Sequence, residues 1–529
     1  MHRRTLLAAG LAAGAGAAPP LAAPALAQDA RARTLRFVPQ ANLTSLDPIW
    51  TTATVTGNHG YTVFDTLYAT DANNRPRPQM VEGHEALDDG RRWRFRLRHG
   101  LRFHDGEPVR AADCIASIGR WCVRDPFGQL LARAVAEWRA LDDRSFEARL
   151  SRPFPLILDC LAKPDASVCF VMPERLANTD PTRAVTEMVG SGPYRFVAGE
   201  YNSGSRAVYE KFDGYVPRGE PPERATGGKV AHLQRIEWHI IPDPATAAAA
   251  LTNGEVDWWE RPLSDLRPML ARNREIRQEI LDPEGRMGLM RLNCLRPPFD
   301  DVRLRRAVRL AVNQENAMRA AQGDDTALWS DCRSLYPRRT PYYRDNPDLM
   351  PGSLDAGRAA LREAGYGGQK VVLINPTDFP DIGPLGLVTH DTLRQLGMNV
   401  DLAESDWGTV IQRRNSREPV ERGGWSIFHT TGTSNTYGSP AMSPLVRGQG
   451  EAGWFGWWSS ERAEALTTEW LDAPDEAARV RAAGALGRLA LEEVATIPLG
   501  QFTIRTAFRR NLTGMLEGST PYPWNIRRT

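Results

Sequence analysis

Residues 371–428 read VVLINPTDFPDIGPLGLVTHDTLRQLGMNVDLAESDWGTVIQRRNSREPVERGGWSIF. Apolar runs and helix-period segments in this stretch predict a strand, a helix, a strand, a helix and a strand. The ranges are 371–374, 385–396, 398–403, 409–415 and 425–428. A β-α-β-α-β order predicts a parallel sheet with right-handed crossovers. The fold class is therefore expected to be α/β.

Polar side chains stand at the predicted end of each of the three strands. In open α/β sheets, a ligand lies outside the carboxyl ends of the strands, and a pocket for a small solute combines polar with aromatic groups. We therefore predict a ligand site formed by Thr377, Asp378, Asp406, Trp407, Trp425, His429, Thr430 and Thr431. The alternative interpretation is that these residues only form turns and surface loops.

The segments on either side of this stretch have a different pattern. Alternating runs at 34–38, 93–97 and 145–150 predict short strands, and residues 71–185 are expected to form a small α+β insert. After residue 284 the helical period returns, with a helix over 355–364 that ends at Gly365.

The N-terminal residues 1–27 are typical of an export signal. Arg3 and Arg4 resemble a twin-arginine motif, although the general secretory route stays open, and Ala25-Leu26-Ala27 predicts cleavage near Ala27. The first 30 residues contain no cysteine, so no lipid anchor is expected. These features predict a soluble periplasmic protein.

The charge balance of the chain excludes the usual nucleic-acid-binding composition. The chain has 66 basic and 64 acidic residues, and loss of Arg3 and Arg4 with the signal leaves 64 of each. Nucleic-acid binding normally needs a clustered basic excess, so no nucleic-acid partner is expected.

Six cysteines are few for 529 residues, so any disulfide would be accessory. Cys160 and Cys169 are a candidate pair that the sequence leaves open. Cys114 and Cys122 would lie about 12 Å apart along one helix, which is too far for a disulfide.

Signatures of common enzymes are missing from the sequence. HExxH, GxxxxGK[ST], GxSxG and CxxC do not occur. The GxGxxG match at residues 448–453 follows no predicted strand, so we interpret it as a flexible loop. No second metal-ligating residue stands at coordination spacing from His429. We therefore predict no catalytic residue, no cofactor and no metal site.

Several separated motifs carry a resemblance to a known family. Residues 95–109, FRLRHGLRFHDGEPV, are followed by Ala112-Asp113 as a helix begins. Further matches are Leu46-Asp47-Pro48, Gly190–Tyr194, residues 253–257 and residues 297–307. In this order they resemble the ABC transporter solute-binding protein family 5 (cluster C), the dipeptide/oligopeptide-binding type. The resemblance covers nearly all of the chain after residue 27.

This resemblance implies a class II periplasmic binding protein-like α/β fold with three lobes. Lobe I would comprise residues 28–70, 186–283 and 501–529, lobe II the insert 71–185, and lobe III residues 284–500. A ligand cleft would lie between lobes I and III, with lobe II as a spacer. The expected partners are a small-molecule or short-peptide ligand and an ABC permease with its cytoplasmic ATPase. The protein would be a monomer and not an enzyme.

The ligand is less well specified than the transport role. Peptide-binding members of the family use a Gly-Trp segment followed by an Asp that pairs with the peptide ammonium, but residues 424–440 contain no acid after Gly424-Trp425. Either Asp378 or Asp406 provides the counter-charge, or the ligand lacks an ammonium and is held by His429, Thr430 and Thr431. The second hypothesis is favoured. An opine, sugar or metal chelate is an alternative ligand, and a twin-arginine-exported enzyme is the alternative function.

Overall fold

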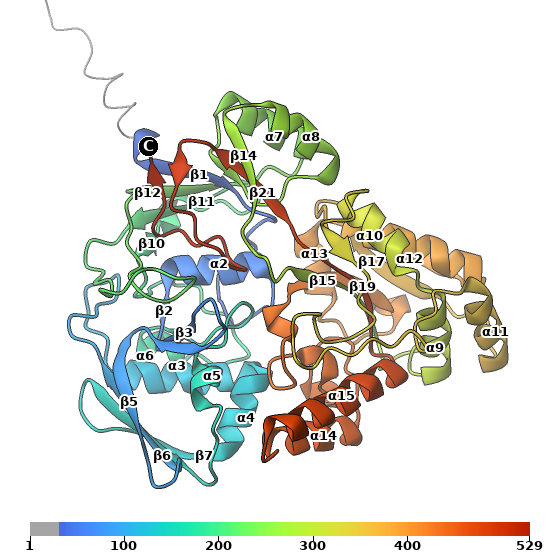
Figure 1. Cartoon of the computed structure of the whole chain (residues 1–529), viewed down its shortest axis with the longest axis horizontal. Coiled ribbons are helices and arrows are strands. Elements are labelled where there is room, and N and C mark those ends of the chain that lie inside the picture. Colours follow the sequence, from blue (N-terminus) through green and yellow to red (C-terminus); the bar gives the residue numbers. More distant parts are fainter. Residues whose placement is uncertain (1–30) are drawn as a thin grey trace, which may run out of the picture.

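The computed structural model describes residues 31–529, which form three larger sheets with their covering helices (Figure 1). The predicted export signal and its cleavage site lie outside the described residues. We use the predicted lobe ranges as names for the three parts. Within residues 31–529, no helix combines the length and apolar character needed to cross a membrane.

Lobe I is organised around a seven-stranded sheet of order β10-β11-β12-β1-β13-β21-β14. The strands are β10 (Tyr194–Phe196), β11 (Arg206–Lys211), β12 (Arg235–His239), β1 (Thr34–Val38), β13 (Trp258–Trp259), β21 (Arg505–Arg509) and β14 (Ile276–Ile280). Strand β1 is parallel to β12 and β13, and the other pairs are antiparallel. The helices are α2 (Thr54–Val63), α7 (Pro244–Asn253) and α8 (Arg267–Arg272), with short 3-10 turns at Ala198–Glu200 and Ser264–Leu266. Strands β22 (Leu512–Thr513) and β23 (Arg527–Arg528) pair near the C-terminus.

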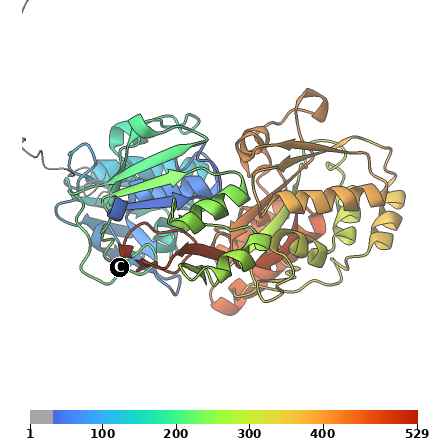
Figure 2. The ribbon, with the colours of Figure 1, turned by 90° about the horizontal axis from the view of Figure 1, so that it is seen from above.

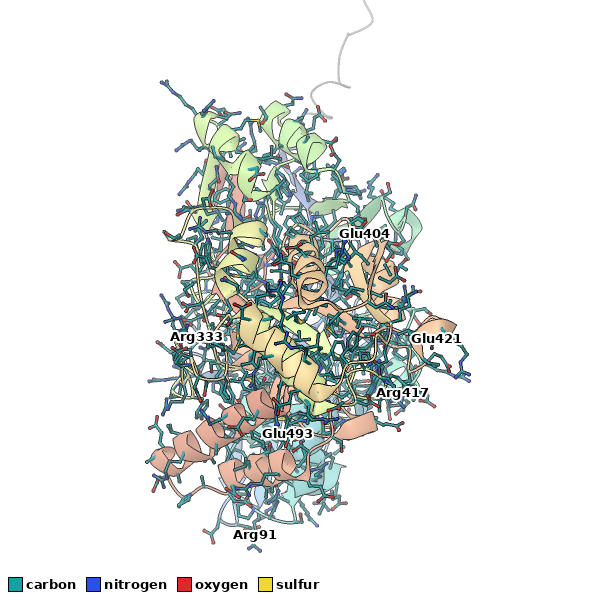
Figure 3. The ribbon with its side chains drawn as sticks, turned by 90° about the vertical axis from the view of Figure 1, so that its right-hand side faces the viewer. Arg91, Arg333, Glu404, Arg417, Glu421 and Glu493 are labelled. Carbon is teal, nitrogen blue, oxygen red and sulfur yellow. The ribbon has the colours of Figure 1, made fainter. Side chains whose placement is uncertain are left out.

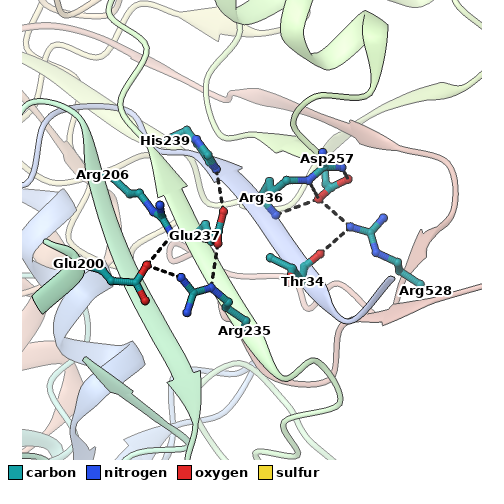
Figure 4. Close-up of polar contacts among 9 residues, drawn as sticks. All are labelled: Thr34, Arg36, Glu200, Arg206, Arg235, Glu237, His239, Asp257 and Arg528. Atoms are coloured by element: carbon teal, nitrogen blue, oxygen red, sulfur yellow. Dashed lines mark hydrogen bonds and ion pairs between the residues drawn. The ribbon is translucent and has the colours of Figure 1, made fainter. Parts of the chain in front are cut away.

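Buried charges connect the strands of this sheet across long sequence separations. Asp257, which immediately precedes β13, accepts hydrogen bonds from Arg36 of β1 at 2.6 Å and forms an ion pair with Arg528 of β23 at 2.6 Å (Figure 4). Asp257 is buried. The bidentate geometry of Arg36 fixes β1 next to β13, and the ion pair of Arg528 holds the end of the chain on lobe I.

Lobe II is an antiparallel four-stranded sheet of order β5-β6-β8-β7, as expected of an α+β insert. Its strands are β5 (Val81–Leu87), β6 (Arg92–Leu97), β8 (Ser145–Leu150) and β7 (Val135–Ala140), and its helices are α3 (Ala111–Arg124), α4 (Pro126–Ala134), α5 (Ile157–Leu161) and α6 (Glu174–Ala177). Two small ribbons flank it: β2 (Asp65–Thr66) with β9 (Phe170–Val171), and β3 (Tyr68–Thr70) with β4 (Pro76–Pro78).

Lobe III contains a six-stranded sheet of order β16-β20-β15-β19-β17-β18. The strands are β16 (Trp329–Ser330), β20 (Thr496–Phe502), β15 (Arg286–Leu292), β19 (Ile427–Thr433), β17 (Val371–Pro376) and β18 (Val400–Ser405). The helices are α9 (Val302–Ala311), α10 (Gln314–Gln322), α11 (Leu354–Ala364), α12 (Gly383–Leu396), α13 (Trp407–Arg413), α14 (Glu461–Leu471) and α15 (Glu476–Glu493). Short 3-10 turns lie at Val420–Arg422, Asn435–Tyr437, Pro444–Val446 and Gly450–Ala452.

The β-α-β-α-β series predicted from residues 371–428 is present as β17, α12, β18, α13 and β19. Strand β17 is parallel to both β18 and β19, which confirms the parallel arrangement of these three strands. Strand β19 begins two residues later and ends five residues later than predicted. His429, Thr430 and Thr431 therefore lie inside a strand and do not follow its end. Antiparallel pairing of β15 with β19 and β20 makes the complete sheet mixed.

The chain crosses between the sheets of lobes I and III twice, at adjacent positions. The first crossing is residues 281–285, between β14 and β15, and the second is residues 503–504, between β20 and β21. Ile280 is paired with Arg505 on one side of the crossing, and Arg286 with Phe502 on the other. The two connections therefore run side by side as a hinge.

Lobes I and III lie side by side in the view from above (Figure 2). One apolar cluster contains Leu35 and Phe37 of β1 together with Trp407, Trp425 and Phe428 of lobe III. Lobe II also contacts lobe III, because Gln449 donates a hydrogen bond to Gln129 of α4 at 2.7 Å. The structure therefore has the lobes in a closed arrangement.

The candidate disulfide between Cys160 and Cys169 is absent, and all six cysteines are free thiols. Both residues are buried in the apolar core of lobe II, and burial raises the pKa of each thiol well above its ordinary value. The sequence left this pair open, and in the structure packing, and not a covalent bond, holds the two segments.

Candidate functional site

Three adjoining cavities lie where the lobes meet, and we call them together the inter-lobe cleft. Their volumes are about 300, 40 and 60 Å³. The first two share Thr52, Ala166 and Trp454 of lobes I, II and III, and the second and third share Thr520. A more open groove of about 720 Å³ lies beyond the hinge, between α8 and the turn after α10.

Two of the predicted site residues line the inter-lobe cleft. Thr430 and Thr431 border the 40 Å³ cavity, opposite Thr54 and Asn58 of α2. The end of β19 and the start of α2 therefore face each other across the junction of lobes I and III.

His429 points away from this cavity and into lobe III. Its Nε2 lies 2.8 Å from the Oγ1 of Thr389 on α12, and its side chain is buried. Burial lowers the pKa of His429 to about 3, so the ring is neutral at physiological pH. The hydrogen bond to Thr389 directs the ring toward α12.

Trp425 is also enclosed in lobe III. It is 0% exposed, its indole Nε1 donates to the carbonyl of Arg414 at 3.1 Å, and its ring packs against Phe428 and Trp457. It precedes β19, so the Gly424-Trp425 segment is not at the edge of the sheet that faces lobe I.

The other four predicted residues lie together at the carboxyl ends of β17 and β18, at the edge where Gly408 approaches Thr44 of lobe I. None of these four, Thr377, Asp378, Asp406 and Trp407, lines one of the three cavities. Figure 3 views lobe III from its outer side, with Glu404 of the same edge labelled. The structure therefore separates the eight predicted residues into three groups.

The two carboxylates of this edge already have backbone partners. Asp406 is the N-cap of α13 and accepts from the amide of Thr409 at 3.0 Å, and hydrogen bonds from the Thr409 hydroxyl and then from this amide lower its pKa. Asp378 accepts from the amide of Trp407 at 2.7 Å, while burial raises its pKa. Both carboxylates stabilise the turn before α13.

Sequence reasoning missed the charged residues of the cleft. Asp165 of lobe II and Asp282 and Arg286 at the hinge line the two smaller cavities. Asp282 and Arg286 are four residues apart, whereas Asp165 lies more than 100 residues earlier, so only the folded chain brings Asp165 to the other two. Asp165 is a non-glycine residue with a φ of 71°, a backbone conformation whose strain is often stored at functional sites.

Buried arginines also surround the cleft. Arg286 donates to Thr54 Oγ1 at 3.1 Å, and Arg414 reaches the hydroxyls of Thr51 and Thr52 at 3.3 and 3.4 Å, while the Nε atoms of both arginines have no partner. Burial lowers the pKa of each guanidinium to about 10, so both remain charged. Arg414 lies over the ring of Phe455, which lines the 300 Å³ cavity.

Aromatic residues of lobe III form one wall of the 300 Å³ cavity, although they are not among the eight predicted site residues. Trp454, Phe455 and Trp457 all line it, opposite Trp50 of lobe I. Aromatic faces combined with a few polar groups suit a small solute. Among residues 31–529, no group of three or more His, Cys, Asp or Glu side chains is arranged to hold a metal ion.

The comparisons with known proteins agree with this architecture. Residues 75–452 match the family model "Bacterial extracellular solute-binding proteins, family 5 Middle". A probable peptide ABC transporter periplasmic-binding protein of Sinorhizobium fredii is 35% identical over 533 residues, covering 100% of this chain and 99% of the relative.

Two solved structures show the same fold. The periplasmic binding protein AgaA of A. tumefacien R10, in complex with agropinic acid, has a TM-score of 0.78 at 20% identity and covers 94% of this chain and 99% of its own. The binding protein DppA of Helicobacter pylori, in complex with the peptide STSA, has a TM-score of 0.78 at 17% identity and covers 95% of this chain and 99% of its own. These matches confirm the predicted α/β periplasmic binding protein fold.

The family match spans more than half of the chain and includes the signature at residues 95–113, so the predicted resemblance is confirmed. Members of the family bind solutes and are not enzymes. The chain belongs to the bacterial extracellular solute-binding proteins of family 5.

Proposed function

We propose that this protein is the exported solute-binding component of an ABC importer and that it captures a small, peptide-like solute in the inter-lobe cleft. The observation that carries the proposal is that all three lobes contribute to one connected cleft around the end of β19. The full-length relative named as a probable peptide-binding component supports the ligand class.

The mechanism follows from the hinge and the cleft. Two adjacent connections let lobes I and III rotate apart and together as rigid bodies. A solute that contacts both lobes binds the closed state more tightly than the open state, so it shifts the population toward closure. The closed molecule then docks on a membrane permease that is driven by a cytoplasmic ATPase.

The same proposal covers the cellular setting. Residues 1–27 would be removed near Ala27 after export, and the mature protein would act as a free periplasmic monomer. A cavity of about 300 Å³, at the lower end of the usual range for ligand sites, favours a solute of dipeptide size over a long peptide.

Native mass spectrometry of the protein purified from its own periplasm tests the ligand class, because a closed cleft can retain its solute through purification. We expect a bound species of small peptide mass. Adding that species to stripped protein should raise the melting temperature and reduce the radius of gyration in small-angle scattering. A retained opine or sugar would contradict the peptide assignment, whereas saturation without any compaction would contradict the closure mechanism.

A further inference from the structure

A carboxylate from lobe II stands at the point where all three lobes meet. Asp165 lies in the segment between α5 and β9. Its Oδ2 accepts a hydrogen bond from Thr433 Oγ1 of lobe III at 2.6 Å, and its Oδ1 accepts one from Ser519 of lobe I. A residue of the presumed spacer lobe therefore contacts both lobes that enclose the ligand.

This carboxylate has only hydroxyl donors as side-chain partners. Asp165 takes part in none of the ion pairs found among residues 31–529, and the residues that hydrogen-bond its side chain are neutral. A carboxylate partly removed from water is costly unless a positive group or several donors compensate its charge. Asp165 therefore has no ion-pair partner among these residues, although the charged Arg286 reaches the same cavity through Thr54.

The cavity beside Asp165 has room for a small charged group. Its volume is about 40 Å³, more than the roughly 10–15 Å³ that a cavity needs to hold one water molecule. A primary ammonium is comparable to water in size, so it can enter this cavity. The cavity also adjoins the 300 Å³ cavity, which can hold the rest of a solute.

An unpartnered acceptor faces the same cavity from lobe I. Thr54, Gly57 and Asn58 share one face of α2, and all three line the cavity with Asp165. The Nδ2 of Asn58 donates to Glu260 at 3.4 Å, which leaves its Oδ1 without a partner although the residue is only 2% exposed. A buried acceptor without a donor is uncommon in folded proteins, and a ligand donor would satisfy it.

The adjoining 60 Å³ cavity carries a second acid. Asp282 Oδ2 is buried and has no hydrogen-bond partner, and burial together with the nearby Asp165 carboxylate raises the pKa of Asp282 to about 6. Arg286 lies near Asp282 and partly offsets this effect, but it does not pair with Asp165. Glu260 and Arg261 line the same cavity, and Arg261 pairs with Glu260 and Asp381, so no ion pair among the described residues joins either arginine of this cavity to Asp165 or Asp282.

We propose that the cavity between Asp165 and Asn58 binds a cationic nitrogen of the solute, with the Asp165 carboxylate as its counter-charge and Asn58 Oδ1 as a further acceptor. An ammonium has three donors and no acceptor, which matches these groups and the threonine hydroxyls around them. This inference rests on the proposed function and narrows it to solutes with a free ammonium. It replaces Asp378 and Asp406 as the counter-charge, and it departs from the expectation of a neutral ligand.

Calorimetry with matched solutes tests this assignment. The probes are a panel of free dipeptides that includes Met-Leu, and the N-acetylated form of each. The variants are Asp165→Asn, which keeps the shape and an acceptor oxygen for Thr433, and Asp355→Asn as a control that removes an exposed carboxylate on α11. Melting temperatures confirm that both variants fold.

We expect free dipeptides to bind the wild type and the Asp355→Asn variant alike, and binding to weaken about tenfold or more in Asp165→Asn. N-acetylation should weaken binding to the wild type by a similar factor and have little further effect in Asp165→Asn. Equal affinity of wild type and Asp165→Asn for free dipeptides would overturn the inference and leave the proposed function standing. Tighter binding of the acetylated forms would also overturn it, and failure of every peptide to bind would contradict both.

Discussion

Arg261 of lobe I and Asp381 of lobe III form an ion pair across the lobe junction, with Nη1 and Oδ2 3.0 Å apart and each side chain only 5% exposed. The Nε2 of Gln322 donates to the other oxygen of Asp381 at 3.2 Å. The pair joins the loop after β13 to the segment before α12. It is therefore made in the closed arrangement and would be broken if the lobes separated.

Replacing Asp381 with Asn should destabilise the closed arrangement. The substitution leaves the guanidinium of Arg261 buried with only the more distant Glu260 at 3.8 Å, and breaking one partner of a buried pair costs about 3–5 kcal/mol. Part of this cost is relieved by opening. We expect a lower melting temperature and a larger radius of gyration in small-angle scattering without ligand.

The matched control is Asp391→Asn, since Asp391 is exposed on α12 and contacts only Gln395 among the hydrogen bonds of the described residues. It should behave as the wild type does. An unchanged radius of gyration in both variants would show that the Arg261–Asp381 pair does not hold the lobes together.

Trp425→Ala should reduce the stability of lobe III. Removing a fully buried indole from between Phe428 and Trp457 leaves a cavity, and such changes typically cost about 3–5 kcal/mol. Urea unfolding measures the loss, with Leu387→Ala, at an exposed position of α12, as a control near zero. A stable variant with weakened ligand binding would instead support the predicted ligand contact of Trp425.

The pH dependence of stability should report on Asp282. Its pKa of about 6 lies above the ordinary value of 3.8, so the unfolded chain releases this proton at lower pH than the folded chain does. The contribution of Asp282 to the free energy of unfolding therefore falls as the pH rises from about 4 to 6. By linkage, the fall is roughly 2–3 kcal/mol.

The Asp282→Asn variant removes that loss. Urea unfolding at pH 4 and pH 7 should show that the variant gains stability relative to the wild type on going to the higher pH. The difference between the two proteins isolates Asp282 from the other carboxylates, many of which act in the opposite direction. A constant difference across this range would mean that Asp282 ionises normally.

Thiol labelling should separate Cys294 from the other five cysteines. Five thiols are buried, whereas Cys294 is partly exposed, although burial also raises its pKa. With iodoacetamide on the native protein, mass spectrometry should find slow labelling at Cys294 first. In denaturant without reductant, six labels are expected, and four would indicate a disulfide.

The α/β series could be predicted from the sequence because its signals are local. Gly397 ends α12 with a φ of 90°, and the apolar run at 371–374 predicts β17. The end of β19 was harder, because polar Thr430–Thr433 continue the strand through pairing with β15, a partner more than 130 residues away. Tertiary pairing overrode the local polar pattern.

From the sequence, the site could be placed only at one edge of the lobe III sheet. Thr430 and Thr431 do border the cleft. Asp165 and Asn58 line the same cavity, but they are so distant in sequence that this contact could not be predicted. Residues of all three lobes line the cleft. The rule that a ligand lies outside the carboxyl ends of the strands was applied only to the sheet of lobe III. Asp165 carries no motif, and its position depends on how lobe II packs on the other two.

Because the chain crosses between lobes I and III only at the adjacent residues 281–285 and 503–504, lobe III is one continuous segment of the chain. Since Arg286 and Phe502 are neighbours in the sheet, the two ends of lobe III meet at one place, and everything between them is an insertion into the sheet of lobe I. Exchange of this single continuous segment between relatives would replace Thr430, Thr431 and the aromatic wall together while leaving Asn58 and Asp165 in place. New ligand preferences can thus arise by recombination of whole segments as well as by point substitution.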